Sequence, residues 1–77
     1  GYESTFLSRL YAKELELRIK KGIGQLPPKC RDIFYMSRYE DLCHREIARR
    51  LNISVSTVEN QIGIALERLR EILKQDG

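Results

Sequence analysis

The chain has 77 residues, of which 42% are hydrophobic and 32% are charged. A chain this short has room for one small core and too little volume for an enclosed active site, and its apolar content is too high for a disordered segment. With 14 Lys and Arg against 11 Asp and Glu, the net charge is +3, a mild basic excess that points only weakly to nucleic acid.

The first predicted element is a helix from about Ser4 to Gln25. Its apolar residues recur at four-residue steps and form one stripe, which consists of Leu7, Tyr11, Leu15, Ile19 and Ile23. We expect Glu16 to stand beside Lys20 on the other, solvated side, because residues four apart on a helix are neighbours. The helix stops at Leu26-Pro27-Pro28, since a residue that precedes proline avoids helical geometry.

Pro28 can open a second helix as its first residue, because its missing N–H would have no helical partner there. This helix is predicted to run to about Tyr39, and Glu40-Asp41 follows as a loop. Its core candidates are Ile33, Phe34 and Met36.

A short third helix and a long fourth helix follow, joined by a sharp turn. The third begins at about Cys43 and ends at Asn52, a residue that tolerates the left-handed conformation of such a turn. Ser54 is suited to cap the fourth helix, with Ser56 and Glu59 as an alternative capping box. The apolar stripe of the fourth helix runs to about Lys74 and consists of Val55, Val58, Ile62, Ala65, Leu66, Leu69, Ile72 and Leu73. No segment alternates like a β-strand, so we predict an all-α, four-helix domain without a wing.

The segment from Glu46 to Val58 has the spacing of a helix-turn-helix motif. Ala48 allows the two helices to approach closely, while Leu51, Ile53 and Val58 fill the wedge between them. A helical hairpin built for packing alone is the alternative, yet packing does not explain a capped turn followed by a row of short polar residues. The fourth helix is therefore the predicted recognition helix. Its amino end can face a phosphate, and its exposed side chains can reach base edges in a major groove.

The candidate DNA contacts fall into two groups. Those expected to read bases are Val55, Ser56, Glu59, Asn60 and Gly63, and those expected to touch phosphates are Lys29, Arg31, Arg38, Arg45, Arg49, Ser54 and Thr57. Asn60 can make a bidentate contact with adenine, and Glu59 can accept a hydrogen bond from cytosine N4. The alternatives are a solvent-facing amide without a DNA contact for Asn60, a capping role for Glu59 and a solvated surface charge at each basic position.

No constellation of residues supports catalysis, a metal site or a cofactor. No serine or cysteine has an evident base, and no glycine-rich loop follows a strand. Cys30 and Cys43 lack zinc-ligand spacing and are expected to be reduced and partly buried, and His44 is expected to lie at the surface near a helix start. No apolar run approaches the roughly 20 residues of a membrane span. We therefore expect a cytoplasmic binding domain without enzymatic activity, a small-molecule substrate or membrane contact of its own.

Three stretches resemble region 4 of bacterial extracytoplasmic-function (ECF) sigma factors. They are Leu26–Phe34 with its Leu-Pro-Pro start, Leu42–Leu51, and Thr57–Asn60 followed by Ala65–Arg70. The resemblance covers about residues 15–74, so residues 15–77 are expected to form the region 4 domain and residues 1–14 to be the end of a linker and the start of the first helix. The resemblance implies a domain that binds promoter DNA at the minus-35 element, docks on the β flap of core RNA polymerase and is controlled by an anti-sigma factor.

Two other kinds of protein share parts of this pattern. The DNA-binding output domain of a LuxR-type response regulator has a similar third and fourth helix, but the Leu-Pro-Pro start argues against it. The second alternative is a helix-turn-helix adaptor that binds a protein and makes little contact with DNA. The modest net charge is compatible with it.

The chain departs from the ECF pattern at several positions. Many members have Ser where this chain has Cys43, which removes the expected hydroxyl cap of the third helix. Many carry Lys or Arg at the positions held here by Glu59, Gln61 and Ile64. Ile64 is expected to contact the first helix, a thymine methyl group or a protein partner. The resemblance is closer to a sub-branch with Thr-Val-Glu-Asn, so the promoter sequence of better-studied members does not transfer to this chain.

Overall fold

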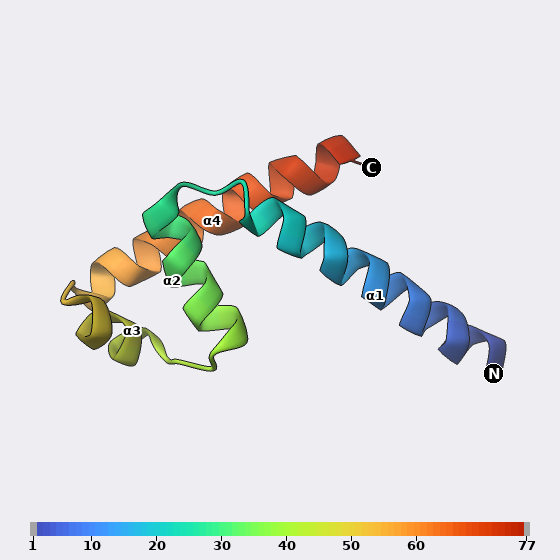
Figure 1. Cartoon of the computed structure of the whole chain (residues 1–77), viewed down its shortest axis with the longest axis horizontal. Coiled ribbons are helices and arrows are strands. Elements are labelled where there is room, and N and C mark those ends of the chain that lie inside the picture. The colour runs from blue at the N-terminus through green and yellow to red at the C-terminus, as the bar shows by residue number, and fades with distance from the viewer. Residues whose placement is uncertain (1, 77) are drawn as a thin grey trace.

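The computed structural model describes the backbone of residues 2–76 and the side chains of residues 9–75. Over this range the chain forms four helices and no β-strand (Figure 1). The helices are α1 (Tyr2–Ile23), α2 (Pro28–Tyr39), α3 (His44–Leu51) and α4 (Val55–Asp76). The prediction of an all-α, four-helix domain with a long last helix is confirmed.

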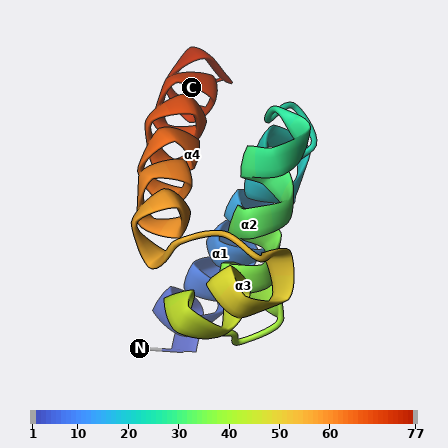
Figure 2. The ribbon, with the colours of Figure 1, turned by 90° about the vertical axis from the view of Figure 1, so that its left-hand side faces the viewer.

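Two clusters of buried side chains hold the helices together. The first joins α1 and its following loop to α2 and α4, and consists of Ile23, Leu26, Cys30, Phe34, Ala65 and Leu69. The second joins α2, α3 and α4, and consists of Ile33, Ile47, Ala48 and Val58. Ile62 of α4 packs against both clusters, so α4 contributes side chains to the core at both places (Figure 2).

The amino-terminal part of α1 extends away from the other three helices (Figure 1). Tyr11, on the predicted apolar stripe, is 68% exposed, whereas Ile23 at the other end of the stripe is buried. Between them, Leu15 is half-buried and Ile19 packs against the first cluster. The stripe therefore meets the rest of the domain only in its second half, and the side chain of Leu7 lies outside the described residues.

Left-handed backbone marks both turns that flank α3. Asp41, in the loop after α2, has φ 54°, and Asn52, after α3, has φ 55°. Asp and Asn tolerate this conformation better than other residues with a side chain, because their short polar groups can bond locally to the backbone. The predicted turn residue Asn52 and the predicted loop at Glu40-Asp41 are both confirmed.

A polar cluster joins α1 to the end of α2. Glu16 Oε2 accepts a hydrogen bond from Arg38 Nη2 at 2.7 Å, and Glu16 Oε1 accepts one from Tyr39 Oη at 2.6 Å. Lys20 Nζ lies 5.7 Å from the centre of the Tyr39 ring. Glu16 thus lies off the apolar stripe, as predicted, and its side chain is 36% exposed, but it bonds to two residues of α2 that the sequence did not suggest. The hydrogen bonds from Tyr39 and Arg38 lower the pKa of Glu16.

The two cysteines have different surroundings. Cys30 is buried in the first cluster, and its thiol donates a hydrogen bond to the backbone oxygen of Gln61 at 3.4 Å. Burial raises the pKa of this thiol, although the charge of Arg68 opposes the shift. Cys43 is exposed, so the expectation that it is partly buried is wrong. Its place at the end of a loop leaves it outside both clusters.

We predict that Glu16→Gln lowers the stability of the domain at neutral pH and matters less in acid. Since the pKa of Glu16 in the folded state lies below its ordinary value of 4.5, the stabilising contribution is present above that value and is lost as the pH falls through the folded-state pKa. Thermal unfolding of both proteins between pH 7 and pH 3 measures the difference in Tm. Glu14→Gln, on an exposed position of the same helix, is the control. A difference for Glu16→Gln that stays constant across this pH range would contradict the prediction.

Candidate nucleic-acid interface

The turn between α3 and α4 is closed by backbone hydrogen bonds. The N–H of Asn52 points to the carbonyl oxygens of Ala48 and Arg49, and the N–H of Ile53 bonds to Ala48 O at 2.9 Å. These bonds satisfy carbonyl groups that the end of a helix would otherwise leave open. The turn therefore has one defined shape, and it sets the direction in which α4 leaves α3.

Apolar packing sets the rotation of α4 about its own axis. Val58 is fully buried in the second cluster with Ala48, which lies 6% exposed at the crossing of α3 and α4. Leu51 and Ile53 are half-buried against the same cluster, which confirms the predicted wedge. Because Val58 must face inward, the opposite side of α4 must face outward.

Ser54 caps the amino end of α4. Its Oγ accepts the N–H of Thr57 at 3.0 Å and lies 2.8 Å from the hydroxyl of Thr57. The predicted cap is confirmed, and it is this serine that serves the first turn rather than the alternative pair of Ser56 and Glu59. The N–H groups of Val55 and Ser56 have no carbonyl within the helix to bond, so the positive end of α4 can receive an anion.

The outward side of α4 carries the base-reading candidates. Ser56, Glu59, Asn60 and Gly63 are all exposed, and Val55 at the edge of the same region is 39% exposed. Residues three or four positions apart share a helix face, so the structure brings these residues together opposite the buried Val58 and Ala65. We call this group the outer face of α4. Its contact with bases remains a prediction.

The phosphate candidates lie at four separate places. Arg45 and Arg49 are exposed on α3, and Lys29 and Arg31 are exposed in the first turns of α2. Ser54 and Thr57 form the cap of α4. Arg38 lies at the other end of α2, where it pairs with Glu16. The structure therefore does not bring Arg38 together with the other candidates.

His44 and Glu59 are brought close by the crossing of α3 and α4. His44 Nδ1 lies 3.9 Å from Glu59 Oε1, and both side chains remain solvent-accessible. From the sequence, His44 is predicted only as a surface residue near a helix start, because the two residues stand on different helices and no local spacing relates them. Beside them, the thiol of Cys43 donates a hydrogen bond to Glu46 Oε1 at 3.2 Å.

The part of the chain that the structure describes holds neither a metal-ligand cluster nor a membrane-spanning helix. No group of three or more His, Cys, Asp and Glu side chains in that part of the chain is arranged to hold a metal ion. None of the helices within residues 2–76 is both long and apolar enough to cross a membrane.

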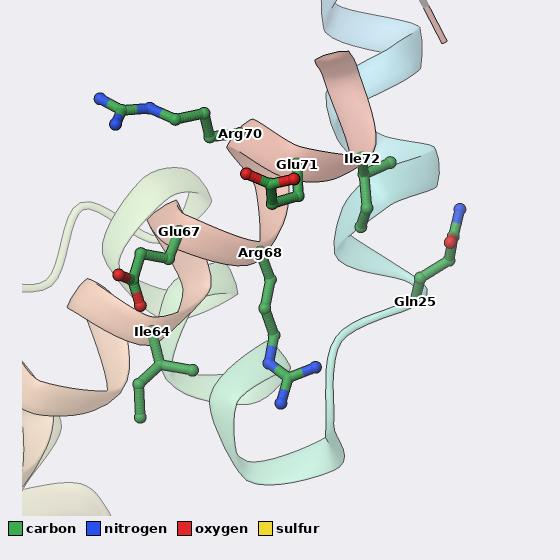
Figure 3. Close-up of a pocket in the computed structure, with 7 residues that line it drawn as sticks. All are labelled: Gln25, Ile64, Glu67, Arg68, Arg70, Glu71 and Ile72. Atoms are coloured by element: carbon green, nitrogen blue, oxygen red, sulfur yellow. The ribbon is translucent and has the colours of Figure 1, made fainter. Parts of the chain in front are cut away.

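A groove of about 820 Å³ opens along α4 beside the end of α1 (Figure 3). Its lining consists of Gln25, Ile64, Glu67, Arg68, Arg70, Glu71 and Ile72. Ile64 packs against the first buried cluster, which accounts for an apolar side chain on this side of α4. Two arginines and two glutamates line the groove, so it has no charge of one sign that would select a nucleic acid or a small anion.

Comparison with known proteins points to one family. Residues 16–69 match the family described as sigma-70, region 4. The chain is also similar to the ECF RNA polymerase sigma factor RpoE of Cereibacter sphaeroides, with 33% identity over 54 residues. The aligned part covers 70% of this chain and 30% of that protein. No solved structure matches the chain.

We predict that Ser54→Ala destabilises the domain by about 1 kcal/mol, because the N–H of Thr57 loses its acceptor. Ser54→Asp should retain most of the stability, since an aspartate caps a helix equally well. Chemical denaturation of the three proteins measures these differences. Ser56→Ala, in the first turn of α4 on an exposed position, is the matched control and should stay close to the wild type. Equal effects of the two alanine substitutions would show that Ser54 does not act as the cap.

Proposed function

The chain belongs to the sigma-70 region 4 family, and we propose from this that it is the promoter-reading domain of an ECF sigma factor. In this proposal it recognises the minus-35 element while docked on RNA polymerase. The family match agrees with the resemblance seen in the sequence and leaves the LuxR-type alternative without support. The name of the similar protein from C. sphaeroides supports polymerase as the partner. A binding role in transcription also agrees with the expectation that the domain is not an enzyme.

The outer face of α4 is the observation that carries the proposal. An α-helix fits into the major groove of B-DNA, where each base pair presents a distinct pattern of donors and acceptors. Asn60 presents an amide from an exposed position one turn into α4, next to a capped amino end that can meet a phosphate. Packing alone would not require a row of exposed short polar residues opposite the buried Val58.

Charge on this surface is divided between helices. From Val55 to Leu66, α4 contains no Lys or Arg, so it cannot neutralise phosphates with its own side chains. We assign the phosphate contacts to Arg45 and Arg49 of α3 and to Lys29 and Arg31 of α2, all of which are exposed. Few such contacts and a net charge of +3 imply weak binding by the isolated domain, so polymerase must supply much of the affinity in the complex.

An apolar groove between α1, α2 and α4 is the site that we assign to the polymerase β flap. The groove holds about 360 Å³, and its apolar lining consists of Ile19, Phe34, Leu66, Leu69 and Leu73. Leu66 is 55% exposed there, an unusual exposure for a large side chain on the core stripe of a helix. Because α3 does not line this groove, the flap and DNA could bind at the same time. An anti-sigma factor would block function by covering either surface.

The central test is a transcription assay with the full-length protein, core polymerase and promoters varied across the minus-35 element. Asn60→Ala should cost about 1–3 kcal/mol at the preferred promoter and relax selection at one base pair, since an amide bonds two atoms of an adenine edge. Arg49→Ala should instead weaken all sequences about equally, because a phosphate contact carries no base information. An unchanged base preference with Asn60→Ala would contradict the proposed reading face. Polymerase binding without any base preference in the wild type would favour the adaptor alternative.

We also predict that Gly63→Ala separates stability from DNA binding. A Cβ at this position would meet no atom within 4 Å, so alanine fits the free domain. It should raise the free energy of unfolding by about 0.5–1 kcal/mol, because glycine is a poor helix former. The added methyl group should nevertheless weaken promoter binding, since it stands where DNA must approach the helix. Denaturation and promoter footprinting measure the two effects, and a stabilised variant with undiminished binding would place Gly63 outside the contact.

A further inference from the structure

We infer that His44 is a positioning residue that holds the Glu59 carboxylate for reading a cytosine in the promoter. The inference rests on the proposed function and extends it to a residue on the helix before the recognition helix. It is carried by the approach of His44 Nδ1 to Glu59 Oε1 at 3.9 Å, across the crossing of α3 and α4.

The position of the pair places it at the DNA-facing surface. Glu59 belongs to the outer face of α4, and His44 is the first residue of α3. The side chains are 43% and 61% exposed for His44 and Glu59, so both can be reached from outside. A contact of 3.9 Å is longer than a hydrogen bond, and it acts by electrostatic attraction and by limiting the directions open to the carboxylate.

The start of α3 adds to this attraction. Cys43 precedes the helix, and its side chain bonds to the Glu46 carboxylate and does not cap a backbone N–H of the first turn. The first helical bond there is from Ile47 N to Cys43 O at 3.0 Å. The N–H groups of His44, Arg45 and Glu46 therefore have no carbonyl to bond within the helix, and they give this end a partial positive charge. A carboxylate near this helix end is stabilised by the partial charge of the N–H groups. Of the two charged side chains in the same turn, Arg45 is positive and Glu46 is negative, so the N–H groups supply the net attraction.

The neighbours of Glu59 make a carboxylate more favourable in the major groove. A carboxylate only accepts hydrogen bonds, and the phosphates on both sides of the groove repel it. A positive or N–H-bearing partner at its side offsets this repulsion. With Oε1 directed at His44, Oε2 of Glu59 is free to accept from a base.

Cytosine is the base that suits this acceptor. Its edge in the major groove offers the N4 amino donor, whereas guanine and thymine offer acceptors to the groove that would repel the carboxylate. Adenine places the N7 acceptor beside its amino group, an arrangement that suits the amide of Asn60 better than the carboxylate of Glu59. Neighbouring residues of α4 would thus read two different bases.

The test uses the full-length protein with core polymerase and a promoter library varied across the minus-35 element. The variants are His44→Ala, His44→Gln, Glu59→Ala and the double alanine variant. Arg50→Ala is the matched control, because Arg50 also lies on α3 and pairs with a glutamate, Glu40, at 3.5 Å. The readout is the preference for cytosine over the other bases at each position, measured separately from the mean activity over all sequences.

We expect Glu59→Ala to reduce the cytosine preference at one position about fivefold or more. His44→Ala should reduce it about two- to fivefold at the same position, the range of a weak contact between two exposed side chains. The double variant should be no worse than Glu59→Ala alone, because His44 acts through Glu59. His44→Gln keeps an N–H donor and should restore most of the preference, while Arg50→Ala should leave it unchanged.

Three outcomes of this experiment would contradict the inference or the proposed function, and they can be told apart. The inference is overturned if His44→Ala lowers activity on all promoters equally, which would indicate a phosphate contact or a purely structural role. It is also overturned if Glu59→Ala leaves the base preference intact, although Asn60 could still read the promoter. A wild type with no base preference in the minus-35 region would instead overturn the proposed function itself.

Discussion

The burial of one side of α4 against both core clusters is the constraint on which the rest of the structure depends. Val58 fixes α4 against α2 and α3, and Ala65 and Leu69 fix it against α1 and α2. A helix held at two places along its length cannot rotate without exposing apolar area to water, which costs about 25 cal/mol for each Å². The outer face of α4 is therefore presented in a single orientation before DNA arrives, and little ordering of the helix remains to be done on binding.

The same constraint separates two surfaces of α4 that serve two partners in our proposal. The first turns carry the outer face beside α3, and the later turns carry the apolar groove beside α1. Contacts between α1 and the rest of the domain keep that groove open in its present shape. The Glu16 cluster joins α1 to α2, and Arg18 donates a hydrogen bond to the backbone oxygen of Leu73 at 2.9 Å. In our proposal, the α1 helix is thus part of the polymerase-facing side and not only a connection to it.

Two departures from the ECF pattern meet at one place in the structure. Cys43 leaves the start of α3 without a hydroxyl cap, and Glu59 brings a carboxylate toward that start through His44. In the sequence alone, Cys43 looks like the loss of a helix cap, and Glu59 looks like the loss of a basic contact. Together they put a negative group at a positive helix end, where its charge is favourable. In our proposal, this pairing gives the recognition surface a chemistry in which an amide and a carboxylate read bases while arginines of α3 hold the phosphates.

Local rules in the sequence determined the helices, their ends and the turn. The proline start of α2, the left-handed Asn52 and the Ser54 cap each depend on residues within one helical turn, and all three were predicted correctly. Burial of the inner side of α4 followed from its period, which also predicted the residues of the outer face. Tertiary structure alone decided the partner of Glu16, the exposure of Cys43 and Leu66, and the approach of His44 to Glu59. The reason is that these contacts join or expose residues on different helices, whose meeting depends on crossing angles that the packing of the whole core sets.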